Sequence, residues 1–193
     1  MKKPFNMFLV SLLILFLCPT VAFSSSEIIA KRGMNEEIVG QVQAMLWEIK
    51  LYDGTIDHEF GPMTEQAVKS FQRKINKPQD GIVTKELEDA LAKESKLDFS
   101  KFRHRFLVEA TAYSSQDPGC GGTTATGVAV RKGIIAVDPG IIPLGTDIYI
   151  PGYGKAVAAD IGGSIKGNII DIAFDTRAEA LQFGYKSLLI YTM

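Results

Sequence analysis

The sequence has few of the residues that form disulfides or bind metals. Its 193 residues include two cysteines, Cys18 and Cys120, and two histidines, His58 and His104. The histidines lie far apart in the chain, and the cysteines and scattered carboxylates show no metal-ligand spacing. We therefore expect no metal and no cofactor. A serine nucleophile is also disfavoured, because the only histidine near the candidate serines is His104, which lies in a connector.

The chain also has no large excess of charge of either sign. The chain has 21 basic residues against 22 acidic ones, a formal net charge of −1, and 46% of its residues are hydrophobic. It contains no block of basic residues and no basic residues interleaved with aromatic ones. Nucleic acid is therefore not an expected partner.

No hydrophobic run is long enough for a stable membrane span. The apolar run over residues 8–18 is about half of the roughly 20 residues that a spanning helix needs. It follows Lys2 and Lys3 and precedes a proline and several small residues, which is typical of a signal peptide, assigned to residues 1–24. Its removal would leave an exported chain with Cys120 as the only cysteine, so no intramolecular disulfide is expected.

The residues after this segment predict two small domains, the first of them helical. Apolar residues recur at three- and four-residue intervals in three segments, residues 35–49, 62–75 and 84–92, as in helices that pack one face on a core. Thr84 is a good N-cap for the third helix. We assign the three-helix domain to residues 33–93.

The second predicted domain is rich in β-structure and follows a connector. Residues 94–105 are charged and lack a clean period, so they predict a linker, and without a long apolar surface in it we expect separable domains. Closely spaced β-rich runs with Gly and Pro turns then predict a barrel or sandwich over residues 106–193. The runs are 106–113, 133–137, 147–150, 156–160, 169–174 and 187–191. Thr176 and Glu179 form the capping-box pattern of one helix, which Gly184 ends.

The helical domain resembles the type 1 peptidoglycan-binding domain over nearly its whole length. Its turn glycines and core apolar residues follow the family's order: Val39, Val42, Gln43, Leu46, Tyr52, Gly54, Ile56, Asp57, Phe60 to Thr64, Ala67, Val68, Phe71, Gln72, Asp80, Gly81 and Thr84. The resemblance implies peptidoglycan as the partner. His58 departs from it, because the family usually has glycine there. Tyr52 and Trp47 remain open between core packing and sugar contact.

The second domain resembles the 3D family, which is named for three aspartates. The residues that carry this resemblance include Ala110 to Tyr113, Thr124 to Gly127, Ile135 to Pro139, Ile142 to Thr146, Pro151 to Gly154, Ala158 to Gly163, Ile165 to Asn168, Ile170 and Asp171. The resemblance implies a double-psi β-barrel like that of the A-type membrane-bound lytic transglycosylases, with Asp138, Asp160 and Asp171 around a saccharide cleft. Ile161 departs from the family, where threonine commonly follows this aspartate. The expected fold class is α+β multidomain, a small three-helix domain before a C-terminal double-psi β-barrel.

The positions of the aspartates suggest their chemistry. Asp160 ends one β-rich run and Asp171 lies in the next, so a simple hairpin would oppose the two carboxylates at about 5 Å, whereas crossing connections would separate them. Like charges that close would keep a proton on one carboxyl. Asp171 also interrupts an apolar run, where an unpaired charge is costly without partners or a function. Asp138 and Asp160 remain open between loop structure and direct chemistry.

These observations give three hypotheses for function. The first is a secreted, cell-wall-associated lytic transglycosylase, as the resemblance implies, with Asp171 as its single acid–base, Asp160 raising the pKa of Asp171, and Asp138 positioning groups in the cleft. A glycoside hydrolase would instead use Asp160 and Asp171 together. A non-catalytic wall-binding protein would only hold glycan. The candidate substrate-binding residues are Thr126, Gly127, Gly162, Gly163 and Lys166.

Overall fold

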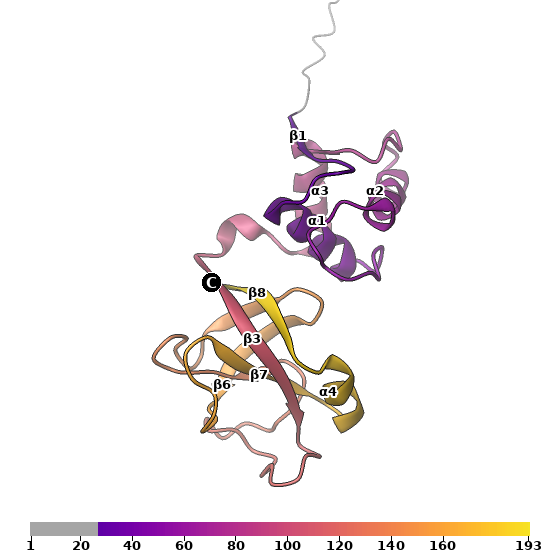
Figure 1. The fold of residues 1–193 in the computed structure, drawn as a ribbon. Coiled ribbons are helices and arrows are strands. Elements are labelled where there is room, and N and C mark those ends of the chain that lie inside the picture. Colours follow the sequence, from indigo (N-terminus) through magenta and orange to yellow (C-terminus); the bar gives the residue numbers. More distant parts are fainter. Residues whose placement is uncertain (1–26) are drawn as a thin grey trace, which may run out of the picture.

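The computed structural model describes residues 27–193, so the expected signal peptide, residues 1–24, lies outside the described residues. A helical domain precedes a closed β-barrel, and the two are joined end to end (Figure 1). This confirms the expected α+β architecture of three helices followed by a barrel. Of the helices in the described range, none has the length and apolar character that crossing a membrane would require.

Three helices form the first domain around one apolar core. They are α1 (Glu37–Glu48), α2 (Pro62–Lys74) and α3 (Lys85–Ser95), with a two-stranded sheet of β1 (Ile28–Ala30) and β2 (Val83–Thr84) beside them. Fully buried side chains from all three helices meet in the core, among them Val42, Leu46, Val68, Phe71 and Leu91. Thr84 caps α3 as predicted, because its hydroxyl accepts a hydrogen bond from the amide of Leu87.

Two buried glutamines hold the loops of this domain. The side-chain amide of Gln43 donates to Asp57 Oδ1 at 2.7 Å. Gln72 donates to Asp80 Oδ1 at 2.6 Å and accepts from the amide of Gly81 at 3.0 Å. Because buried polar groups are costly when unpaired, these contacts specify the loop conformations. These motif residues therefore have a structural role.

Tyr52 and His58, which the sequence analysis singled out, also have structural roles. Tyr52 is 6% exposed and donates its hydroxyl hydrogen to the carbonyl oxygen of Thr55 at 2.6 Å, which is packing. His58 adopts the left-handed conformation with φ of 67°, which explains the family's glycine. Its ring lies over Gly40, where an added Cβ would be 2.8 Å from Nε2. The glycine in α1 thus makes room for the histidine.

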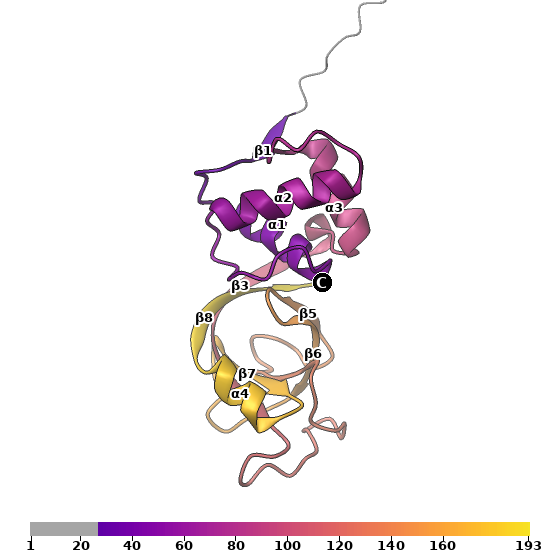
Figure 2. The same ribbon diagram turned by 90° about the vertical axis from the view of Figure 1, so that its right-hand side faces the viewer.

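Six strands close the barrel of the second domain. They are β3 (His104–Ser114), β4 (Ile134–Ala136), β5 (Asp147–Ile150), β6 (Gly154–Asp160), β7 (Ile169–Phe174) and β8 (Lys186–Thr192), in the spatial order β3-β7-β4-β6-β5-β8. The pairs β3–β7 and β4–β6 are parallel and the others antiparallel. The helix α4 (Arg177–Phe183) begins with the predicted Thr176–Glu179 capping box and lies against the barrel wall (Figure 2).

Of the two connections that the sequence left open, the crossing one forms between β6 and β7 and the hairpin does not. These strands are not neighbours, because β4 lies between them and pairs with both. Ala136 of β4 is the register partner of Asp160 on one side and of Asp171 on the other. Two strand spacings therefore separate the two aspartate backbones, roughly 9 to 10 Å. The crossing connection of the barrel prevents the direct contact.

The connector also differs from the expectation of a linker without apolar contacts. Leu97 is 2% exposed, and the rings of Phe99 and Phe102 pack against Tyr149 and Tyr191 of the barrel with centroids 4.9 to 6.1 Å apart. Phe99 lies in a short 3-10 helix, η1 (Phe99–Lys101). An ion pair between Arg105 and Glu37 adds to this contact. The two domains therefore share an apolar interface, which the irregular spacing of these three residues conceals in the sequence.

Candidate functional site

Asp171 lies in the middle of β7 on the outer face of the barrel. Its neighbours Ile170 and Ile172 are buried in the barrel core, so alternation along the strand turns Asp171 outward. Its register partner on β3 is Thr111, whose hydroxyl donates to Asp171 Oδ1 at 2.8 Å. Thr111, Asp171, Ala136 and Asp160 form one row across four adjacent strands, with the small Ala136 between the two carboxylates.

Burial raises the pKa of Asp171 above its ordinary value. The negative charges of Asp117 and then Asp160 raise this pKa further, while the hydrogen bond from Thr111 lowers it. The direction agrees with the expectation that one carboxyl holds its proton to higher pH. The main cause differs from the expected one. Desolvation raises the pKa of Asp171 most, and the charge of Asp160 raises it less.

Asp160 ends β6 and is held by three donors. Its Oδ1 accepts hydrogen bonds from the amides of Ala125 and Ile161, each at 2.9 Å. Its Oδ2 accepts from the hydroxyl of Tyr113 at 2.8 Å. The register of β6 against β4 shifts between Ile135 and Ala136, so an additional β6 residue stands just before Asp160. Such bulges re-aim side chains, and this one directs Asp160 toward Tyr113 and the loop at Ala125.

Asp138 connects two loops at the end of β4. Its carboxylate accepts from the amide of Gly140 at 3.0 Å and from that of Gly167 at 2.9 Å. These two amides and the nearby Lys166 ammonium lower the pKa of Asp138. Asp138 is therefore ionised at neutral pH, and its contacts match the loop-organising alternative left open by the sequence.

The candidate binding residues Thr126 and Gly127 lie on the loop whose amide at Ala125 contacts Asp160. The Thr126 hydroxyl donates to the carbonyl oxygen of Ala159 at 2.8 Å, so it fixes the loop to β6. Gly127 has φ of 83°, a conformation that favours glycine. This loop lies at the end of the barrel that is farther from the helical domain (Figure 1).

The other three candidates lie on the loop between β6 and β7. At Gly162 an added Cβ would lie 2.6 Å from a side-chain carbon of Ile165, so glycine lets this loop close over a buried isoleucine. Gly163 has open space around its Cα, and Lys166 is exposed beside Asp138. Only Lys166 among these three presents a polar side chain to solvent.

Sequence reasoning missed three residues that surround the aspartates. Thr111 and Tyr113 lie two residues apart on β3, so they share the outer face of the barrel. This alternation is the pattern in the sequence from which their position could have been predicted. Asp117 had no comparable signal, since it lies in a turn. Its carboxylate accepts from the amide of Ser114 at 2.7 Å and from Arg177 Nε at 3.0 Å.

A small apolar cluster supports this face of the barrel. Tyr113 and Cys120 pack against its buried members, which are Val130, Ile134, Ala159 and Ala173. Over residues 27–193, histidine, cysteine, aspartate and glutamate side chains nowhere form a group of three that could hold a metal ion. The chemistry visible here is that of carboxylates with hydroxyl and amide donors.

Comparisons with known proteins agree with the sequence patterns. A peptidoglycan binding domain model matches residues 35–91, and the 3D domain model matches residues 133–193. The cell wall-binding protein YocH of Bacillus subtilis is 47% identical over 87 residues, which cover 43% of this chain and 30% of that protein, well under two thirds of its length.

Two solved structures are also similar. The N-terminal domain of SleB matches with 32% identity and a TM-score of 0.34, covering 34% of this chain and 90% of that one. MltA from E. coli matches with 26% identity and a TM-score of 0.31, covering 36% of this chain and 26% of that one. The family matches thus identify in this chain a peptidoglycan binding domain followed by a 3D domain.

Proposed function

We propose that this protein is exported to the cell wall, binds peptidoglycan and cleaves its glycan strands as a lytic transglycosylase. The observation that carries the proposal is the position of Asp171, a half-buried carboxyl on the outer face of β7 that accepts a hydrogen bond from Thr111 and has a raised pKa, whereas backbone amides lower the pKa of Asp138. Peptidoglycan binding is supported by the family match over residues 35–91 and by the cell wall-binding relative.

A lytic transglycosylase needs one group that both gives and takes a proton. In the proposed reaction, Asp171 protonates the oxygen that bridges two sugars, and its raised pKa favours the protonated form that this step requires. The resulting carboxylate then accepts the proton of the muramic acid 6-hydroxyl, whose oxygen closes a 1,6-anhydro ring. The Thr111 hydroxyl, which donates to Asp171, stabilises the carboxylate between the two steps.

The positions of the other aspartates favour supporting roles. A carboxylate has about four acceptor sites, and donors already occupy three of those of Asp160. Asp160 is therefore a poor base for activating water. We assign it to holding Tyr113 and the Ala125 loop around the cleft, and Asp138 to ordering the loop that carries Lys166.

One observation favours a second candidate, an inverting glycoside hydrolase. Such enzymes place two carboxyl groups about 6.5 to 9.5 Å apart, with water between them. The backbones of Asp160 and Asp171 lie two strand spacings apart, roughly 9 to 10 Å, which leaves room for such a separation of their carboxyl groups. A third candidate, wall binding without catalysis, would need neither carboxyl to react.

Mass spectrometry of digested peptidoglycan separates the three candidates. Purified wall is incubated with the full chain and with Asp171→Asn, and the soluble fragments are analysed. We expect 1,6-anhydro ends from the native chain and background levels from the variant. Reducing ends instead would establish the hydrolase, and intact strands that sediment with the protein would establish binding alone.

A further inference from the structure

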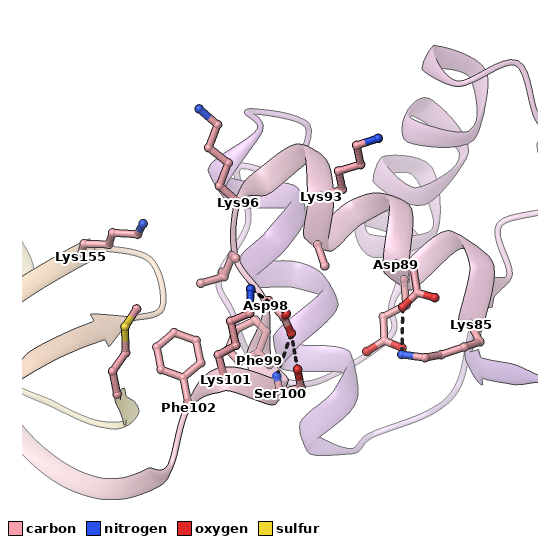
Figure 3. Close-up of a pocket in the computed structure, with 14 residues that line it drawn as sticks. Lys85, Asp89, Lys93, Lys96, Asp98, Phe99, Ser100, Lys101, Phe102 and Lys155 are labelled. Carbon is pink, nitrogen blue, oxygen red and sulfur yellow. Dashed lines mark hydrogen bonds and ion pairs between the residues drawn. The ribbon is translucent and has the colours of Figure 1, made fainter.

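A separate site lies where the helical domain meets the barrel (Figure 3). This pocket has a volume of about 580 Å³, and its walls come from α3, the segment 97–102, Lys155 of β6 and Met193. A neighbouring pocket of about 400 Å³ shares Phe102, Lys155 and Met193 and extends along β5 and β6 to Arg131. The two pockets adjoin at these shared residues, and we call them together the junction groove.

The first pocket of the junction groove carries an excess of positive side chains. Five lysines and three side-chain carboxylates line it, together with the last residue of the chain, Met193. Two of the lysines are paired, Lys85 with Glu88 and Asp89, and Lys101 with Asp98. The remaining three, Lys93, Lys96 and Lys155, form no ion pair with any residue of the described range. A chain of net charge −1 thus concentrates unpaired cations at one place.

The fold explains only part of this concentration. Lys93 lies in the last turn of α3 and Lys96 at its C-cap, where the helix dipole favours cations. Lys155 has no such reason, because it comes from β6 of the other domain and still lines the same pocket. Figure 3 shows these three lysines extended along one side, with Phe99 and Phe102 below them. Cations from both domains therefore line the same pocket.

The lining of the pocket indicates the kind of ligand. Lysine binds phosphate as a mobile point charge, whereas the planar fork of arginine pairs in a fixed geometry with carboxylate and phosphate alike. The first pocket is lined by lysines and by no arginine. Separate ammonium groups along a groove suit tetrahedral anions that repeat along a flexible chain, and the half-buried Phe99 and Phe102 rings offer apolar faces to the carbons between them.

We propose that the junction groove binds the phosphodiester groups of an anionic wall polymer, a polyol phosphate chain. The inference rests on the wall location in the proposed function, and it adds a second ligand to peptidoglycan. The aspartate site and the junction groove lie on different residues, so the two can be tested separately.

The binding of a defined probe tests this proposal. Fluorescently labelled poly(glycerol phosphate) is titrated with the full chain at low salt, where exposed charges are least screened. We expect saturable binding that Lys93→Gln/Lys96→Gln/Lys155→Gln weakens about tenfold or more, since three charge contacts are lost together. The matched control Lys31→Gln/Lys77→Gln/Lys186→Gln removes the same charge outside the groove, and we expect its Kd to stay within about twofold of the native value.

Three results would overturn the proposal. Equal weakening by both triple variants would show general attraction to a polyanion. Equally tight binding of a polyglutamate of matched charge would remove the preference for phosphate. Inorganic phosphate that competes as well as the polymer, per phosphate, would indicate a small-anion site. Release of anhydro ends from peptidoglycan stripped of phosphate polymers is measured in parallel and tests the proposed function alone, while circular dichroism melting verifies that all variants fold.

Discussion

Tyr113 reaches from β3 to Asp160 at the end of β6, although β7 and β4 lie between these strands in the barrel. Burial raises the pKa of Tyr113, and the negative charges of Asp160 and Asp171 raise it further. The hydroxyl therefore stays protonated and donates its hydrogen to Asp160. The phenol of Tyr113 thus links β3 to β6 across the two strands between them, and it lies close to the carboxylates of Asp160 and Asp171.

Replacing Tyr113 with phenylalanine should lower turnover and leave the fold intact. The ring keeps its packing against the cluster at Ala173, while Asp160 loses one of three donors. A hydrogen bond to a charged group contributes about 1.5 to 3 kcal/mol, so we expect kcat for anhydro-product release to fall roughly tenfold with little change in KM. Tyr185→Phe, at a residue that is 68% exposed, is the control. An unchanged kcat would remove Tyr113 from the site.

Asp171→Asn should abolish catalysis without loss of stability. Loss of an acid–base group typically costs about 100- to 10,000-fold in rate, whereas Asp53→Asn on the exposed loop of the helical domain should have no effect. Because the folded-state pKa of Asp171 is raised, its contribution to stability is present below the unfolded pKa and is lost as pH rises through the folded pKa. The variant should therefore be more resistant to urea than the native chain at neutral pH but not at about pH 3. A folded variant that still releases anhydro ends would exclude the assigned role.

Removing a neighbouring charge should change the pH dependence of the rate. Asp117 and Asp160 both raise the pKa of Asp171, and Asp117 contributes more. Replacement of either aspartate by asparagine lowers this pKa, so the general acid loses its proton at lower pH. The alkaline limb of the pH–rate profile therefore shifts to lower pH. We expect the larger movement for Asp117→Asn. A lower rate with an unmoved limb in Asp160→Asn would assign Asp160 to positioning alone.

The aromatic interface should couple the unfolding of the two domains. Phe99→Ala/Phe102→Ala removes both rings from Tyr149 and Tyr191, and partly buried large-to-small changes cost about 1 to 3 kcal/mol each. We expect the native chain to melt in one calorimetric transition and the double variant in two. Leu107→Ala, at a residue that is 64% exposed, should melt like the native chain. Two transitions in the native chain would show that the domains unfold independently.

The local elements could be predicted from the sequence because their signals are local. Residues 147–150 and 169–174 were expected as strands and have those bounds as β5 and β7. The caps at Thr84 and Thr176 form as their side chains require. Period, capping and turn chemistry each involve residues a few positions apart, which a single sequence displays.

The arrangement of the site depends on contacts between distant segments, and these were only partly predictable. The separation of Asp160 from Asp171 follows from where β4 inserts, which no local pattern records. Asp117 acts on Asp171 across the barrel surface, and in the sequence it is one turn residue among many. The interface at Phe99 and Phe102 was missed for the same reason, since isolated aromatic residues among charged ones show no period.

The packing of Phe99 and Phe102 on the barrel has a geometric consequence for any long substrate. A binding domain on a flexible tether lets a catalytic domain sample every bond within reach, and its fragments vary in length. Here the packing of Phe99 and Phe102 on Tyr191, together with the ion pair of Arg105 with Glu37, fixes the orientation of one domain relative to the other. If the chain cleaves glycan as proposed, the distance from its point of attachment on the wall to the bond that is cut is then fixed, and we expect fragments of a preferred length.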